Sequence, residues 1–162
     1  SYVVDAIGDV VIEAANSGLD TISSSVSLTN PLAANVENLV LTGTAIAGTG
    51  NSLNNSLTGN ASANTLNGGL GNDILTGLQG NDTFIFTSRS GADRITDFTA
   101  GRGAGDVIQL SLGTAFDSFT EVRAAARQVN ADTLLDFGDL GSITLQSVSV
   151  SALAADDFLF AA

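Results

Sequence analysis

The chain has 162 residues, with 5 basic residues, all arginine, against 17 acidic residues, and a formal net charge of -12. Such a charge repels phosphate backbones and anionic membrane surfaces, so cations are better partners than nucleic acid or lipid. The absence of His, Cys and Lys excludes a Ser-His-Asp or Cys-His nucleophile, a zinc site of the usual ligands and a Schiff base. No apolar run reaches the roughly 18 residues that a membrane span needs, so we expect no membrane insertion.

The N-terminal part of the chain is predicted to form short strands. Residues 2–12 and 19–28 are rich in Val, Ile, Ser and Thr, which favour strands over helices. The chain begins at Ser1 rather than at a methionine. We therefore expect it to be an excised or processed piece of a longer protein.

A nine-residue repeat follows, with the pattern Gly-Gly-x-Gly-x-Asp-x-U-x, where U is a large apolar residue. Residues 68–76 read GGLGNDILT and match every position, and residues 77–85 read GLQGNDTFI, with Leu78 at the second Gly position. Counting backward in nines gives GNASANTLN and GNSLNNSLT, which begin at residues 59 and 50 and have Asn64 and Asn55 in place of Asp. Residues 18–22, GLDTI, repeat the Gly-x-Asp-x-U core.

Each part of the repeat has a mechanical role. Glycines permit positive φ and close backbone approach, so six residues form a tight turn that aims carbonyl groups inward at a cation. The last three residues form a short strand with one inward apolar side chain. Two units complete a coil of about 18 residues, and coils stack about 4.8 Å apart as two parallel sheets. The repeat therefore predicts an all-β-dominated parallel β-roll.

The coil length predicts that side chains 18 residues apart stack along each rim of the roll. Oxygen-bearing side chains then form two columns: Asp20, Glu37, Asn55 and Asp73 on one rim, and Asn64 and Asp82 on the other. Ile46 lies one coil before Asn64 and has no ligand atom. Ca²⁺ takes six to eight oxygen ligands, which carboxylates and turn carbonyls supply. We therefore expect Ca²⁺ as the cofactor.

The repeat resembles the RTX β-roll proteins, especially the C-terminal half of serralysin-type secreted proteases and other type I secretion substrates. In that family the ligands are the backbone oxygens at positions two and four and the carboxylate at position six. The resemblance implies the ligands Gly69, Gly71 and Asp73 in one loop, and Leu78, Gly80 and Asp82 in the next. The segment Asn35–Asn38 is similar to a family motif whose Glu, here Glu37, is also a ligand. Sites shared with Asn55 and Asn64 are expected to be weak or incomplete, because a neutral amide attracts a divalent ion less.

The nine-residue spacing stops after Phe86. Residues 93–98, DRITDF, and 106–111, DVIQLS, resemble the segments that close the roll in this family. We expect Asp93 or Asp97 to complete the site above Asp73. An alternative is that each is a turn carboxylate without a metal.

A C-terminal cap is predicted after these segments. Residues 118–121, SFTE, form a capping box that opens a helix, whose expected apolar face is Phe119, Val122, Ala126 and Val129. Two strands, residues 133–137 and 142–146, read as a hairpin. A cap covers strand edges that would otherwise invite association. The expected organisation is degenerate coils at 1–49, the calcium-binding roll at 50–86 and an α+β cap at 87–162.

The final residues, DDFLFAA, are similar to the export signal at the end of type I secretion substrates, and an ordinary last strand is compatible with that role. The resemblance implies a secreted, noncatalytic calcium-binding module whose partners are a type I exporter and an upstream domain of the same polypeptide. An alternative is a polysaccharide-binding accessory module of an extracellular carbohydrate-modifying enzyme such as an alginate epimerase. A third class is a hydrolase that uses paired carboxylates alone, as glycosidases do.

Overall fold

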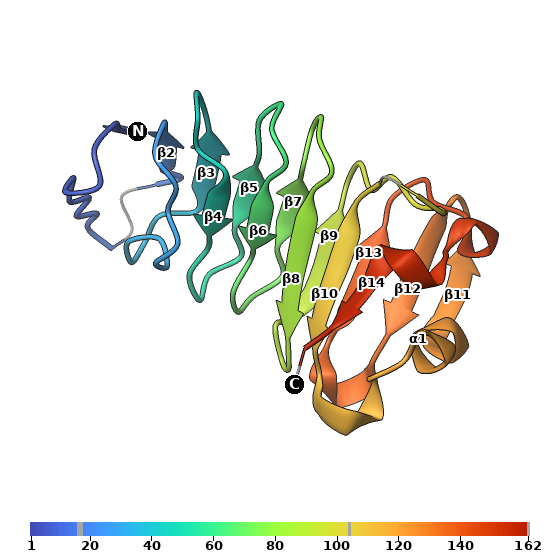
Figure 1. Cartoon of the computed structure of the whole chain (residues 1–162). Helices are drawn as coiled ribbons and strands as arrows, with labels where there is room; N and C mark the ends of the chain where they lie inside the picture. The colour runs from blue at the N-terminus through green and yellow to red at the C-terminus, as the bar shows by residue number, and fades with distance from the viewer. Residues whose placement is uncertain (16–17, 104, 162) are drawn as a thin grey trace.

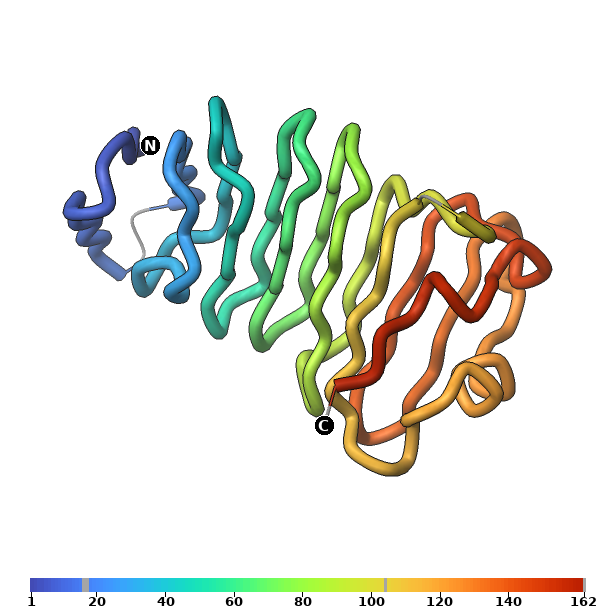
Figure 2. Tube along the Cα trace, in the orientation of Figure 1, coloured from blue at the N-terminus to red at the C-terminus, as the bar shows by residue number. Residues whose placement is uncertain are grey.

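The computed structural model describes residues 1–15, 18–103 and 105–161. Short strands wind into a roll whose two sheets face each other, and the C-terminal part adds a helix and antiparallel strands (Figure 1). The predicted fold class, a parallel β-roll with an α+β cap, is confirmed. Figure 2 shows the coils stacked one after another from the N-terminus toward the cap.

The strands belong to two sheets of unequal size. The larger sheet contains, in spatial order, β1 (Tyr2–Val4), β2 (Thr21–Ser24), β3 (Asn38–Leu41), β5 (Ser56–Thr58), β7 (Ile74–Thr76), β9 (Ala92–Ile95), β13 (Ser142–Leu145), β12 (Asp132–Asp136) and β11 (Ala126–Val129). The smaller sheet contains β14 (Phe158–Phe160), β10 (Val107–Ser111), β8 (Thr83–Thr87), β6 (Thr65–Asn67) and β4 (Ala47–Thr49). The helical elements are α1 (Phe119–Ala125) and four 3₁₀ turns at Gly113–Ala115, Gly138–Leu140, Val150–Ala152 and Ala155–Asp157.

The register of the central coils is the predicted one. Leu57 pairs with Leu75 across β5 and β7, and Leu66 pairs with Phe84 across β6 and β8. Both pairs are parallel and 18 residues apart, so two nine-residue units do complete one coil. Parallel pairing continues beyond Phe86 through β9 and β10, so the roll is longer than the repeat that predicts it.

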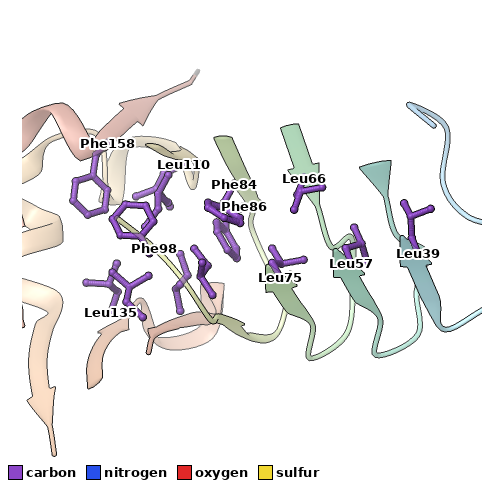
Figure 3. Packing of buried hydrophobic residues seen from close by; sticks show 14 of the residues in the cluster. Leu39, Leu57, Leu66, Leu75, Phe84, Phe86, Phe98, Leu110, Leu135 and Phe158 are labelled. Carbon is purple, nitrogen blue, oxygen red and sulfur yellow. The ribbon is translucent and has the colours of Figure 1, made fainter. Parts of the chain in front are cut away.

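The core is a row of apolar side chains between the two sheets (Figure 3). The four residues at the apolar repeat position, Leu57, Leu66, Leu75 and Phe84, have no solvent exposure. Toward the cap the row widens with aromatic residues, and the rings of Phe84 and Phe98 lie 6.2 Å apart between centroids. Each coil therefore buries its apolar side chains between the two sheets, next to those of the neighbouring coils.

The cap differs from the prediction in one element. Helix α1 begins after Ser118, whose backbone N–H donates to Glu121 Oε2 at 3.1 Å, as the capping box predicts. The helix ends at Ala125, because residues 126–129 form β11 and pair antiparallel with β12. Val122 is fully buried, but Val129 is an exposed strand residue, so the prediction of a helical face that extends to Val129 was wrong.

The predicted hairpin is present, and the predicted first strand is shorter than expected. Strands β12 and β13 pair antiparallel, and β13 also pairs in parallel with β9, which attaches the hairpin to the end of the roll. Strand β1 covers only residues 2–4 of the predicted 2–12, since the backbone turns at Ala6–Asp9 with an Asp9 N–H to Ala6 carbonyl bond of 3.1 Å.

Candidate metal centre

The position-six side chains of the repeat stack along one rim of the roll. The backbone N–H of Asn55 donates to Asp73 Oδ1 at 2.7 Å, and the N–H of Asp73 donates to Asp93 Oδ1 at 2.9 Å. All three side chains are buried. Of the two alternatives that the sequence offered, Asp93 is therefore the one that lies directly above Asp73.

A second column runs along the other rim. The N–H of Asn64 donates to Asp82 Oδ1 at 2.7 Å, and the N–H of Asp82 donates to Asp106 Oδ1 at 2.8 Å. Asp106 was missed as a site residue because it lies 24 residues after Asp82 rather than 18. A signal was available, since Asp106 stands two residues before the inward Ile108 just as Asp82 stands two before Phe84.

Asp97 belongs to this second rim and not to the site above Asp73. Its carboxylate accepts hydrogen bonds from the N–H groups of Gly77 and Leu78, at 3.0 and 2.8 Å. It also contributes to the raised pKa of Asp82 as a nearby negative charge. Of the two residues expected at the place above Asp73, Asp93 occupies it, because the connection from β8 to β9 makes this coil 20 residues long, and Asp97 lies four residues further on.

Two buried side-chain oxygens within the described residues have no hydrogen-bond partner, and both belong to the repeat aspartates: Asp73 Oδ2 and Asp82 Oδ2. Each aspartate is only 1% exposed. Burial raises the pKa of Asp73 to about 7 and that of Asp82 to about 6, with like charges at Asp93 and Asp106 as further causes. A buried unpaired carboxylate oxygen is costly unless a cation or a donor meets it.

The turns bring the backbone of successive coils into close contact. Gly69, Gly71 and Gly80 have positive φ values of 96°, 115° and 132°. A Cβ atom on Gly80 would lie 2.6 Å from the Ser62 carbonyl oxygen of the coil below. Leu78 also takes a positive φ of 72°, which is strained for a side-chain-bearing residue. The glycines are thus required for loop stacking, and Leu78 adopts the same backbone without being glycine.

The two predicted acids of the N-terminal coils continue the first column. Glu37 Oε2 accepts a hydrogen bond from the Asp20 N–H at 2.8 Å, so its carboxylate is turned toward the preceding coil. Both side chains are half-buried. The structure therefore places Glu37 one coil after Asp20 and one coil before Asn55, since Asn38 pairs in parallel with both Thr21 and Ser56, and Asn55 Nδ2 lies 3.1 Å from the Glu37 carbonyl oxygen.

The site residues fit a hard cation held mainly by backbone oxygens. No group of three or more His, Cys, Asp or Glu side chains converges in the part of the chain that the structure describes. Each rim instead contributes one carboxylate per coil next to closely stacked backbone turns. This donor set, with its unpartnered carboxylate oxygens, suits Ca²⁺ rather than a metal that requires nitrogen or sulfur.

The final strand is integrated into the cap. Strand β14 pairs in parallel with β10, and Phe158 is buried. The buried Asp157 side chain accepts hydrogen bonds from the N–H groups of Gly101 and Ala154, at 2.9 and 2.8 Å. Within residues 1–15, 18–103 and 105–161, no helix is long and apolar enough to cross a membrane.

Comparison with known proteins identifies the repeat and places the chain among longer proteins. A family model for the RTX calcium-binding nonapeptide repeat (4 copies) matches residues 49–84. Two curated relatives come from Rhizobium meliloti (strain 1021): the endo-1,3-1,4-beta-glycanase EglC, 45% identical over 92% of this chain, and the endo-1,3-1,4-beta-glycanase ExsH, 40% identical over 90% of it. The chain spans 30% of the length of each relative.

A solved structure has the same fold over most of the chain. The crystal structure of the extracellular lipase LipA from Serratia marcescens aligns with a TM-score of 0.60 and 27% sequence identity. The alignment covers 89% of this chain and 20% of the lipase chain. The lipase and the two glycanases are therefore much longer than the regions that align with this chain.

Proposed function

We propose, from the premise that residues 49–84 are RTX calcium-binding nonapeptide repeats, that this chain is a noncatalytic module that folds on binding calcium outside the cell. Its partners would be calcium, an upstream domain of the same polypeptide and a type I exporter. The observation that supports this most strongly is the pair of buried, unpartnered oxygens at Asp73 and Asp82.

The residues that would hold calcium are those of the stacked loops. The carboxylates of Asp73 and Asp82 would supply the charge, and Asp93 and Asp106 would extend the two columns into the next coil. The backbone oxygens of the loop residues Gly69, Gly71, Leu78 and Gly80 would supply the neutral ligands. When bound, the ion provides two positive charges where aspartates stack, which offsets both their burial and their mutual repulsion.

A calcium titration of substituted chains tests this assignment. Asp73→Ala removes a buried stacked carboxylate, whereas Asp5→Ala removes an exposed one far from the loops. We expect Asp73→Ala to lose at least one calcium per chain or to weaken its binding at least tenfold, and Asp5→Ala to bind as the parent does. Isothermal titration calorimetry measures both values. Equal losses in the two variants would disprove the assignment.

The longer protein to which the chain would belong is proposed to act on a 1,3-1,4-linked β-glycan. Both named relatives are endo-1,3-1,4-beta-glycanases, and the similarity extends over at least 90% of this chain. The same observation favours a second candidate function, in which this module itself binds the polysaccharide. Affinity electrophoresis through a mixed-linkage β-glucan tests whether the module binds the polysaccharide. Retarded migration of the isolated module with calcium supports direct binding, and unchanged migration rejects it.

A further inference from the structure

The two repeat units before the aspartate loops carry paired asparagines. Positions two and six are Asn51 and Asn55 in the unit that begins at residue 50, and Asn60 and Asn64 in the unit that begins at residue 59. Asn55 and Asn64 are each only 2% exposed. Asn51 and Asn60 are half-buried, and all four residues belong to turns that correspond to the proposed calcium turns.

In the first pair, both amide groups donate to carbonyl oxygens of the preceding coil. Asn51 Nδ2 lies 2.9 Å from the carbonyl oxygens of Ala33 and Val36. Asn55 Nδ2 lies 3.1 Å from those of Val36 and Glu37. The Asn55 Oδ1 atom accepts from the Asn51 N–H at 2.7 Å, so both ends of this buried amide have partners.

The second pair makes a similar arrangement on the other rim. Asn60 Nδ2 donates to the Ala45 carbonyl oxygen at 2.6 Å. Asn64 Nδ2 lies 3.4 Å from the same oxygen and 3.3 Å from Asn60 Oδ1. Asn64 Oδ1 accepts from the Asn60 N–H at 2.7 Å, so this buried amide is also satisfied by the protein.

The next coil has the same backbone register but fewer side-chain hydrogen-bond donors for its buried acceptors. At position six Asp73 and Asp82 leave one buried oxygen each without a partner among the described residues. At position two Gly69 and Leu78 have no side-chain donor. The contrast is internal to one fold, because the strands after Asn55 and Asp73 pair residue for residue.

We infer that the asparagine pairs are amide clasps, which close their coil with hydrogen bonds where the next coil requires calcium. The amide N–H groups meet the inward carbonyl oxygens that a cation would otherwise meet, and they add no charge to the rim. The calcium requirement then begins at Asp73 and Asp82. Coil 50–67 is a metal-independent template on which the calcium-dependent coil 68–85 assembles; this order of assembly rests on the proposed function.

Conversion of the clasps into half-sites tests the inference. In the variant Asn55→Asp/Asn64→Asp, two donors become acceptors at buried positions. The matched control is Asn54→Asp/Asn72→Asp, which adds the same charge at two exposed loop positions. The Oδ1 atoms of Asn54 and Asn72 each accept a hydrogen bond from a backbone N–H at 2.8 Å, and a carboxylate at either position can keep that bond.

We expect the clasp variant to melt at least about 5 °C below the parent in metal-free buffer, because it buries unpaired carboxylates. Calcium should restore most of that loss, and calorimetry should find at least one more calcium per chain than in the parent. The control should bind the parental number and melt within about 2 °C of the parent. A clasp variant with unchanged melting in metal-free buffer, or without additional calcium, would overturn the inference.

Hydrogen exchange of the unsubstituted chain gives an independent readout. In metal-free buffer, amides of β5 and β6 should exchange at least tenfold more slowly than those of β7, and calcium should remove the difference. Equal exchange in all three strands would overturn the templating. If the parent bound no calcium, the proposed function would fail as well, whereas a calcium-binding parent with an unaffected clasp variant would refute the clasps alone.

Discussion

At the scale of single residues, Asp73 and Asp82 couple the metal-free fold to pH. Their pKa values are raised to about 7 and about 6, mainly by burial, so the folded chain binds protons more tightly than the unfolded chain. The stability that their protonation contributes is fully present below the unfolded pKa of about 4 and is lost as the pH rises through 6 to 7.

We therefore predict that the metal-free chain melts at a higher temperature at pH 5 than at pH 8. With saturating calcium the order should reverse, because protons compete with the ion for the same oxygens. Circular dichroism melts at the two pH values measure the effect. The variant Asp73→Asn/Asp82→Asn should lose about half or more of the metal-free pH dependence, since the pKa of Asp93, which burial raises to about 6, sustains the rest; retention of the full dependence would show that other groups cause it.

At the scale of elements, the strands and their register were predictable because one apolar residue recurs every nine positions and faces inward. The same counting predicts that Asp73 stacks over Asn55. Counting fails where connections lengthen, so the sequence left Asp93 and Asp97 as alternatives for the place above Asp73, and Asp106 was missed. The end of α1 was also unpredictable locally, since residues 126–129 keep a helical apolar spacing but pair with β12.

The amide clasps show a different limit of sequence reasoning. Asn55 and Asn64 were expected to be weak calcium ligands, an expectation based on their oxygen atoms. The structure turns their nitrogen atoms toward carbonyl groups of the preceding coil or turn. Which end of an amide faces the turn depends on tertiary contacts that no local pattern specifies.

The loop between β7 and β8 allows a test of backbone strain. Leu78 has a positive φ of 72° and is 55% exposed, whereas Leu70 is 51% exposed and is not among the positive-φ residues. Replacement by glycine removes similar exposed surface at both positions, but it relieves strain only at Leu78. We predict that Leu78→Gly is more stable than Leu70→Gly by about 1–2 kcal/mol in saturating calcium. Urea unfolding measures the difference; equal stabilities would contradict the strained backbone.

At the scale of the whole molecule, the final strand would serve two purposes in succession. It is proposed to be read by the exporter, and in the folded chain it completes the smaller sheet beside β10. Deletion of residues 157–162 is predicted to reduce secretion through a type I exporter at least tenfold while most calcium binding remains, because the tail lies outside the repeat.

The control for this deletion is Val122→Ala, which removes buried volume from the cap and leaves the tail intact. Immunoblots of medium and cells should show Val122→Ala secreted like the parent. Equal secretion of the deletion variant and the parent would reject the export signal. Loss of secretion in Val122→Ala to the same extent would show that cap stability, not the tail, determines export.

Calcium binding is proposed to drive the folding of the roll. Without metal, folding brings buried aspartates of successive coils together along each rim. Folding also costs more backbone entropy in glycine-rich loops than elsewhere. An ion that binds only the folded chain adds about 4 kcal/mol per site at a thousandfold excess over Kd. Thermal melts followed by circular dichroism, in calcium and then in excess chelator, measure this directly. We predict that calcium raises the Tm by at least about 10 °C; an unchanged Tm would show that calcium does not drive folding.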